Sequence, residues 1–496
     1  EGLQDEVANH AAIVGHRNTW QKKGRGLYSP FQIIDCVEKA LSTPFEEGLK
    51  YERESFARCL ESPQRKGLIH AFFAERRCRK IPELREIEPR KLERLAVIGG
   101  GTMGGGIAVA ALDAGLEVMM VERDEAGLEK GRLNVEKVYD RHISKGRMGP
   151  EDKKEVLERF IPSTDFERIA DADMVIEAVF EEMEVKKEVF RILDQYARQG
   201  AVLASNTSYL DIDEIASVTS RPEEVLGLHF FSPANIMKLL EIVVPSGLSN
   251  EVLATGFALG NRMGKVPVRS ANSEGFIGNR ILGAYSKVAG YMMEDGTSPY
   301  RIDEVVRDFG YPIGPFQMFD LAGGDIGWAN RKRKASTRDP KERYVEIADR
   351  LCERGWFGQK TGRGFYLYEE GSRTGIEDPE VLDIIAGERS TKGIRAREYS
   401  PEEIIRRYLG AMVNEAAKVL EEKVARCPSD IDVVQHYGYG FPRYRGGPMK
   451  YADMYGIRKI VEDIEEFSVE DPFFWNPSKL LKTMAAQGQT FEDLNQ

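Results

Sequence analysis

The chain has 496 residues, of which 42% are hydrophobic and 30% are charged, with a formal net charge of −11. This length predicts about two to four domains, and the apolar content is sufficient for several cores. The negative charge balance argues against nucleic acid or an anionic membrane as the main partner.

Several sequence features bear on the compartment. We find neither a signal peptide nor an apolar run long enough for a transmembrane helix, and the last residues lack a peroxisomal tripeptide. The five cysteines are scattered without CxxC spacing, so neither a disulfide framework nor a metal site is predicted. We therefore expect a soluble, cytoplasmic protein without membrane insertion. The cysteines are Cys36, Cys59, Cys78, Cys352 and Cys427.

Residues 1–90 show a helical pattern. Helices are predicted to begin near Ser29, Pro44 and Ser62, and a polar linker follows from about Pro82. The third helix has a wide apolar face, which is typical of a helix that docks onto another domain. No catalytic cluster is seen here, and we interpret the histidines of this part as surface or packing residues. That apolar face consists of Leu68, Ile69, Ala71, Phe72 and Phe73.

The motif around which the chain can be arranged lies between residues 91 and 124. An apolar strand leads into Gly99, Gly101 and Gly104, and an apolar helix and a second strand ending at Glu122 follow. The acid comes about 20 residues after the middle glycine, as a dinucleotide-binding βαβ unit requires. A Gly-rich turn that binds no ligand is the alternative.

The residue types of this turn suit a pyrophosphate. Gly99 permits the tight turn, Gly101 lets the backbone approach the anion, and Gly104 lets the helix pack against the strand. Thr102 and Met103 open the helix, whose free N–H groups face the anion. We predict that these five residues bind the cofactor.

Glu122 decides which dinucleotide is expected. Its carboxylate can accept hydrogen bonds from both hydroxyls of the adenosine ribose, but it would repel a 2′-phosphate. We therefore predict NAD rather than NADP. The neighbouring Arg123 is the one residue that favours NADP.

Polar side chains follow the later strands of the predicted sheet. Buried strands are expected at 173–179 and 201–204, and ligands bind at the carboxyl ends of such strands. A further strand is expected over 225–233 with a histidine, His229, toward its end, and 239–244 is expected to be the last strand of the domain. The polar residues at these ends are Glu181, Lys186, Asn206, Ser208, His229 and Ser232.

Glu241 is a carboxylate within an otherwise apolar strand. A buried, unpaired charge is costly, so it needs a partner. His229, on the preceding strand, is the nearest candidate. A surface-facing glutamate on an edge strand is the alternative.

Beyond Pro267 the pattern becomes helical. A long helix is expected from about residue 275 with Asn279 near its start, a second helix over 301–309 and a third from about 320. The basic cluster 331–334 is either a solvated face or a contact for a phosphorylated substrate. A polar linker is expected over 369–400.

The last segment is a weak copy of the one before it. Residues 404–409 are similar to 277–282, and 431–434 are similar to 302–305. Arg406 stands where Asn279 stands in the first copy. We therefore interpret the second copy as a packing duplicate, and its His436 as structural.

With these residues assembled, the chain from about 91 to 490 resembles the L-3-hydroxyacyl-CoA dehydrogenase family. The matching motifs include VIGGGTMGGGIA, SNTSYL, GLHFFSPANIMKLLEIV, GFIGNRIL, GPFQMFDLAGGDIGW and FGQKTGRGFY. The duplication is most similar to the multifunctional enzymes of β-oxidation, and residues 25–82 are similar to the end of their enoyl-CoA hydratase domain. The crotonase core itself is not in this sequence, so hydratase activity is not expected from it.

The resemblance implies a domain order. We expect a helical hydratase remnant and linker helix (1–90), a doubly wound α/β Rossmann NAD-binding domain (91–270), and an all-α dehydrogenase C-terminal domain (271–375) followed by its duplicate (376–496). Ser232 and Glu122 depart from the commoner Asn and Asp of the family, but both keep the needed hydrogen-bonding chemistry.

The resemblance also implies the chemistry. His229 would be the general base for oxidation of (S)-3-hydroxyacyl-CoA by NAD in fatty acid β-oxidation, with Glu241 orienting its ring. Ser208 and Asn279 would hold the substrate, while Glu181, Lys186 and Ser208 would lie by the nicotinamide. Asn206 and Ser232 are also expected to bind the cofactor.

Two other functions remain open at this point. One is an NAD-linked hydroxyacid dehydrogenase that uses another acyl carrier. The other is an assembly module that docks a hydratase domain or a thiolase subunit.

Overall fold

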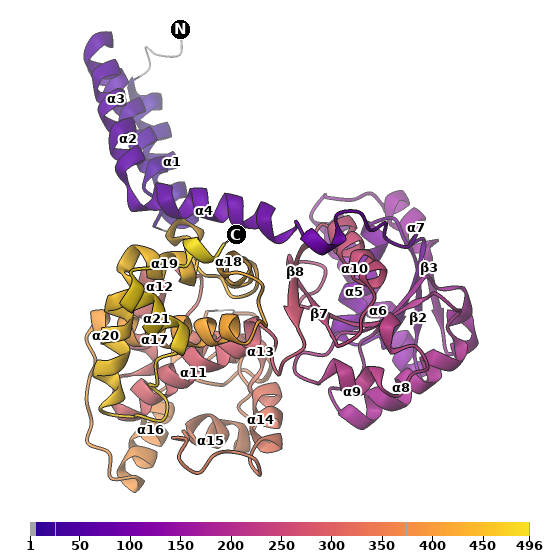
Figure 1. The fold of residues 1–496 in the computed structure, drawn as a ribbon. Helices are drawn as coiled ribbons and strands as arrows, with labels where there is room; N and C mark the ends of the chain where they lie inside the picture. Colours follow the sequence, from indigo (N-terminus) through magenta and orange to yellow (C-terminus); the bar gives the residue numbers. More distant parts are fainter. Residues whose placement is uncertain (1–5, 25, 373, 496) are drawn as a thin grey trace. The chain divides into compact units, whose positions relative to one another are not determined.

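The structure is a computed structural model that describes residues 6–24, 26–372 and 374–495. The chain forms two compact units (Figure 1). The sheet unit consists of Phe72–Ile281 with Ala416–Tyr439 and the residues from Asp493 on. The helical unit consists of the residues up to Ala71, Leu282–Glu415 and Gly440–Glu492. Within the described part of the chain, none of the helices has the length and apolarity needed to cross a bilayer.

The sheet unit is built on one sheet with the strand order β3-β2-β1-β4-β5-β6-β7-β8. Neighbouring strands are parallel except at β6 and β7, which are antiparallel. The strands are β1 (Arg94–Ile98), β2 (Glu117–Val121), β3 (Phe160–Ser163), β4 (Met174–Glu177), β5 (Val202–Ser205), β6 (Val225–Phe230), β7 (Leu239–Val244) and β8 (Val266–Ala271).

Helices cover both faces of this sheet (Figure 1). Side chains alternate along β1, so that Leu95 and Val97 belong to one core while Ala96 and Ile98 belong to the other. The first core includes side chains of α5 (Thr102–Asp113), α6 (Glu125–Ser144) and α10 (Asn250–Arg262). The second includes those of α8 (Met183–Tyr196) and α9 (Ile212–Ala216). The doubly wound Rossmann fold expected from the sequence is confirmed.

One expectation about the sheet is wrong. We expected β7 to be the last strand, but α10 and β8 follow it, and β8 pairs with β7 in parallel. The misleading feature is Pro267 within β8, because proline is usually excluded from strand interiors. As a result β7 lies between two strands, and Glu241 on it is not at an edge of the sheet.

The remaining helices are mostly in the helical unit. They are α1 (Glu6–Lys23), α2 (Ser29–Ser42), α3 (Phe45–Glu61), α4 (Pro63–Cys78), α11 (Gly278–Asp295), α12 (Pro299–Phe309), α13 (Pro315–Ala322), α14 (Gly324–Arg333), α15 (Ile347–Glu353), α16 (Pro379–Thr391), α17 (Pro401–Glu421), α18 (Pro428–Gly438), α19 (Pro448–Tyr455), α20 (Ile457–Ser468) and α21 (Lys479–Gln487). A short α7 (Pro150–Leu157) belongs to the sheet unit. The helical C-terminal region is thus confirmed.

Two details of the helical part differ from expectation. The segment 369–400, expected to be a polar linker, contains α16. The helix expected to open near residue 320 is two helices, because the chain turns between α13 and α14 at Gly323, where φ is 90°. The division into the four domains given above remains our proposal.

The sequence repeat has a structural counterpart in two buried acids. Asp303 on α12 is fully buried and accepts hydrogen bonds from the N–H groups of Phe316 and Gln317, both at 2.9 Å, at the start of α13. Burial raises the pKa of Asp303 to about 7. Asp432, at the matching position of α18, is also fully buried. Each copy therefore keeps an aspartate inside its second helix.

Candidate active site

The site is organised around the histidine and the glutamate of β6 and β7. The antiparallel register places His229 directly opposite Glu241, and the His229 Nδ1 lies 2.7 Å from the Glu241 Oε2. The His229 residue is 3% exposed and Glu241 is fully buried. The structure therefore brings together the two residues that the sequence paired, and it leaves Nε2 as the other ring nitrogen.

The second carboxylate oxygen of Glu241 holds the start of α11. Its Oε1 accepts hydrogen bonds from the N–H groups of Ile277, at 3.2 Å, and Gly278, at 2.9 Å. These are otherwise unpaired donors of a helix N-terminus, where a negative charge is stabilising. Phe276, just before them, is buried with a φ of 50°, which is uncommon for a residue with a side chain. Glu241 thereby fixes the position of the next residue, Asn279, relative to His229.

Asn279 is half-buried and lies beside the loop after β5. Its Nδ2 donates to the Ser208 carbonyl oxygen at 3.4 Å, and its Oδ1 accepts from the Tyr439 hydroxyl at 2.9 Å. The structure thus connects Ser208 and Asn279. Tyr439 was not expected at the site. It lies in the aromatic Gly/Pro segment YGYGFP (437–442), a pattern that does not by itself connect this residue with Asn279.

The loop after β5 is held by carboxylates. Glu181 Oε1 accepts hydrogen bonds from the Ser208 N–H at 2.7 Å and from the Thr207 hydroxyl at 2.6 Å. Asn206, predicted to contact the cofactor, accepts from the Phe230 N–H at 2.9 Å through its Oδ1. These contacts tie the ends of β4, β5 and β6 together at the edge of the sheet where doubly wound folds bind ligands.

Lys186 differs from what we expected. Its side chain is 1% exposed, and its Nζ donates to the buried Glu177 at 2.6 Å and lies 3.4 Å from Glu181. An ammonium that left this position would leave the buried Glu177 carboxylate with neutral donors, the Ser205 hydroxyl and the Val179 N–H, and without its charged partner, which is costly. Lys186 therefore lies behind Glu181, and we propose for it a supporting role, not a direct cofactor contact.

The glycine turn has the geometry that its sequence predicts. Gly99 has a φ of 100°, and a Cβ on Gly104 would lie 1.8 Å from the Gly99 carbonyl oxygen. A Cβ on Gly101, by contrast, would meet no atom of the described residues within 4 Å. The turn is therefore closely packed at Gly104, whereas the space next to Gly101, directly before α5 begins at Thr102, is unoccupied by described residues. Met103 is partly buried against the core.

Glu122 lies beneath this turn. Its Oε1 accepts a hydrogen bond from the Gly100 N–H at 2.5 Å. Arg123 is directed elsewhere, because its side chain is 91% exposed and pairs with Asp124 at 3.3 Å. The open face of Gly101, the free N–H groups of α5 and the Glu122 carboxylate together fit an NAD molecule. Ser232, after β6, is exposed.

Comparison with known proteins identifies the family. The model of the 3-hydroxyacyl-CoA dehydrogenase NAD binding domain matches residues 94–273. The model of the C-terminal domain matches 275–368 and again 404–493, so the repeat seen in the sequence corresponds to two copies of one family domain.

A relative and two solved structures agree. The chain is 42% identical over 487 residues to the peroxisomal bifunctional enzyme of Danio rerio, covering 94% of this chain and 67% of that protein. Its fold is similar to 3-hydroxybutyryl-CoA dehydrogenase from Escherichia coli (TM-score 0.69, 27% identity, 80% of this chain and 99% of that one). It is also similar to the dehydrogenase part of multifunctional enzyme 1 from C. elegans (TM-score 0.62, 27% identity, 84% and 96%).

Two points follow from these comparisons. Our expectation of a cytoplasmic location is wrong, because the Danio rerio relative, like others of similar identity, is a peroxisomal enzyme by name; the missing C-terminal tripeptide was not a sufficient argument. The chain spans about two thirds of the length of these relatives. With both domain models matched, the chain belongs to the 3-hydroxyacyl-CoA dehydrogenase family.

Proposed function

We propose that the chain oxidises (S)-3-hydroxyacyl-CoA to 3-oxoacyl-CoA with NAD, as a step of fatty acid β-oxidation, and that His229 is its general base. The observation that carries this proposal is the buried pair of His229 and Glu241, with the Glu241 carboxylate 2.7 Å from the Nδ1. Because the carboxylate accepts the Nδ1 hydrogen, the lone pair lies on Nε2. That nitrogen can take the proton of a C3 hydroxyl.

Glu241 has two roles in this proposal. It fixes the tautomer of His229, and its charge stabilises the imidazolium that forms when the proton is taken up. Its second oxygen holds the first N–H groups of α11, so the base and Asn279 are connected through one side chain. The glycine turn and Glu122 would hold NAD, and the bound cofactor would supply the acceptor for the hydride of C3. In the reverse direction, the protonated His229 returns the proton to the oxygen at C3.

Ser208 and Asn279 are proposed to hold the substrate. The Asn279 Nδ2 has a second hydrogen beyond the one that faces the Ser208 carbonyl. This hydrogen and the Ser208 hydroxyl can both bind oxygens of a 3-hydroxyacyl thioester. Two such contacts restrict the rotation of the substrate, so that C3 is presented in one orientation.

A comparison of substrates tests the function. We expect NADH oxidation with acetoacetyl-CoA, and much slower oxidation with NADPH, since Glu122 would repel its 2′-phosphate. Free acetoacetate is the matched control for the carrier, and turnover with acetoacetate as fast as with acetoacetyl-CoA would point instead to a hydroxyacid dehydrogenase. Hydration of crotonyl-CoA serves as a second control, for which we expect no activity. A folded chain that oxidises NADH with neither substrate would contradict the proposal.

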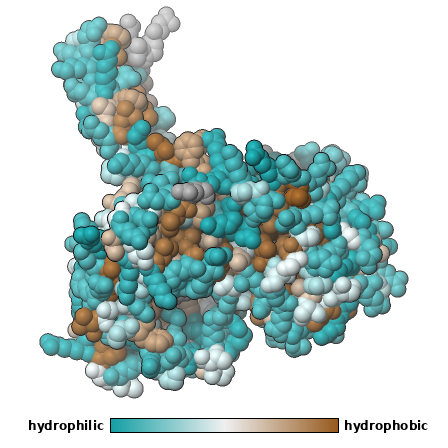
Figure 2. Space-filling model, viewed as in Figure 1, coloured by the Kyte–Doolittle hydropathy of each residue, from teal (hydrophilic) through white to brown (hydrophobic). Residues whose placement is uncertain are grey.

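We also propose a partner surface on the N-terminal helices. Helices α2, α3 and α4 carry apolar side chains that are largely exposed (Figure 2), and an apolar face of this size marks an interaction site. Because the relatives are longer and are named bifunctional enzymes, we propose a hydratase domain as the occupant. The side chains include Ile33 (64% exposed), Val37 (51%), Phe45 (77%) and Phe56 (64%).

Light scattering tests this second proposal. The purified chain should self-associate through the uncovered face, and replacing Ile33, Phe45 and Phe56 by serine should make it monomeric without changing dehydrogenase turnover. Self-association that survives the three replacements would contradict this use of the surface.

A further inference from the structure

We propose that Tyr439, from the second copy of the duplicated helical sequence, is a positioning residue that orients the amide of Asn279 for the reaction. This inference rests on the function proposed above, in which Asn279 binds the substrate. It changes the interpretation of the second copy, which the sequence alone led us to regard as a packing duplicate.

Two contacts determine the orientation of the Asn279 amide. The Tyr439 hydroxyl donates to Oδ1 at 2.9 Å, and Nδ2 donates to the Ser208 carbonyl oxygen at 3.4 Å. If the amide turned over, its oxygen would face the Ser208 carbonyl, which has no hydrogen to donate. Because an amide to carbonyl contact of 3.4 Å is long and weak on its own, the shorter contact from the tyrosine is the stronger restraint. Removing the hydroxyl would leave the substrate-binding group free to rotate.

The sequence provides space for this contact at two glycines. A Cβ on Gly278, at the start of α11, would lie 2.4 Å from the Tyr439 Oη. A Cβ on Gly438, at the end of α18, would lie 2.6 Å from the Leu239 Cδ2 on β7. Both glycines lie in helices, so it is the absence of a side chain that is needed and not an unusual backbone conformation. They allow α18 and α11 to approach the sheet and each other closely.

The docking of α18 on the sheet is specific. The strand β8 is extended by a bridge between Ser270 and Ala425, and the Ala271 N–H donates to the Val424 carbonyl at 2.8 Å. Helix α18 then packs on β7 and β8. The Tyr439 ring lies edge-on against Phe231, with centroids 5.6 Å apart, and Phe231 in turn contacts the His229 ring at 4.3 Å. The ring of Tyr439 is therefore held by packing while its hydroxyl donates to Asn279.

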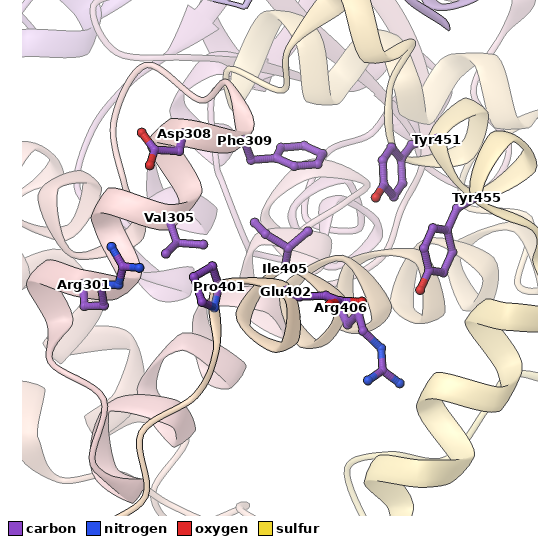
Figure 3. Close-up of a pocket in the computed structure, with 10 residues that line it drawn as sticks. All are labelled: Arg301, Val305, Asp308, Phe309, Pro401, Glu402, Ile405, Arg406, Tyr451 and Tyr455. Atoms are coloured by element: carbon purple, nitrogen blue, oxygen red, sulfur yellow. The ribbon is translucent and has the colours of Figure 1, made fainter.

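In the first copy of the repeat the corresponding tyrosine makes a different contact. The segment 309–311 (FGY) matches 437–439 (YGY), and the Tyr311 hydroxyl donates to the Met412 Sδ at 3.8 Å. Arg406, the counterpart of Asn279, pairs instead with Asp463 and Glu466. It lines a cavity of about 370 Å³ beside Phe309, but its guanidinium points away from that ring (Figure 3). The hydrogen bond from Tyr439 to Asn279 is therefore not repeated at Arg406 in the described part of the chain.

A double-mutant cycle tests the proposal in the full chain. Tyr439→Phe keeps the packed ring and removes one neutral hydrogen bond, so we expect kcat with acetoacetyl-CoA to fall about 3- to 10-fold, with no change in the KM for NADH. In an Asn279→Ala background, Tyr439→Phe should have no further effect on kcat, because its target is gone. A purely structural role would lower kcat by the same factor in both backgrounds, and that result would overturn the proposal.

Further variants distinguish a failure of the positioning role of Tyr439 from a failure of the proposed role of Asn279. Tyr139→Phe removes another buried hydroxyl of the sheet unit, one that donates to Asp113 at 3.0 Å, and it should leave kcat unchanged. If Asn279→Ala lowers kcat but Tyr439→Phe does not, the positioning role is refuted while the proposed function stands. If Asn279→Ala is itself as active as the wild type, the proposed role of Asn279 is refuted, and the role of Tyr439 with it.

Discussion

Replacing Glu241 by glutamine tests the link between the base and the helix α11 most sharply. The carboxylate accepts three hydrogen bonds, from His229 Nδ1 at 2.7 Å, from Ile277 N–H at 3.2 Å and from Gly278 N–H at 2.9 Å. All three partners are donors, whereas a glutamine has one accepting oxygen and one donating amide. Glu241 is fully buried, so water cannot replace a lost partner.

The outcome for the base follows from this geometry. With the glutamine oxygen on the two N–H groups of α11, its NH₂ faces His229 Nδ1 and favours the tautomer with the hydrogen on Nε2. The base then carries its lone pair on the wrong nitrogen, and the charge that stabilises the imidazolium is lost. We expect kcat with acetoacetyl-CoA and NADH to fall by about 10²- to 10⁴-fold.

The assay follows NADH absorbance, with NADH binding measured separately by fluorescence. Glu294→Gln is the control, because Glu294 is also a buried carboxylate, 1% exposed, but lies in the helical unit with Arg343 and Lys392. We expect this control to lose stability and to retain turnover. A folded Glu241→Gln variant with more than about a tenth of the wild-type kcat would refute the reasoning.

Further predictions concern the cofactor, the glycine beside the tyrosine and a buried acid. Glu122→Ala should narrow the preference for NADH over NADPH by at least about tenfold, measured as the ratio of kcat/KM values; an unchanged ratio would show that Glu122 does not select the cofactor. Gly278→Ala should displace the Tyr439 hydroxyl and lower kcat at least as much as Tyr439→Phe does, whereas full activity would mean that the space at Gly278 is not needed. For Asp303, burial raises the pKa from 3.8 to about 7, so the folded state binds this proton more tightly than the unfolded state. Its stabilising contribution is present below about pH 4 and is lost as the pH rises through about 7. The melting temperature of the wild type relative to Asp303→Asn should therefore fall from pH 5 to pH 8, and a difference that grows over this range would contradict the assignment.

Much of the sheet unit could be predicted because its signals are local. The glycine turn, the apolar strands and the polar residues at their ends each occupy a few consecutive residues, and the doubly wound order follows from their alternation with helices. The strand β8 was not predicted because it contains Pro267. Helix α16 was not predicted because its polar sequence is also typical of a linker. Neither error affected the placement of His229 or the glycine turn.

Part of the candidate site could likewise be predicted from the sequence, and part could not. The pairing of His229 with Glu241 could be anticipated, because a carboxylate within an apolar strand needs a partner and the adjacent strand offered one. Tyr439 could not be anticipated, since it is 160 residues from Asn279 in the sequence and meets it only after α18 has docked on β7 and β8. The burial of Lys186 also depends on packing around Glu177, which no sequence pattern shows.

The measurement that tests the central claim most directly is the turnover of His229→Ala with acetoacetyl-CoA and NADH, beside the wild type and the control His142→Ala. The account predicts that His229→Ala lowers kcat by at least about 10²-fold while NADH still binds, and that His142→Ala, in the last turn of α6, retains activity. A His229→Ala variant that keeps more than about a tenth of the wild-type rate would contradict the assignment of the base, and with it the proposed mechanism.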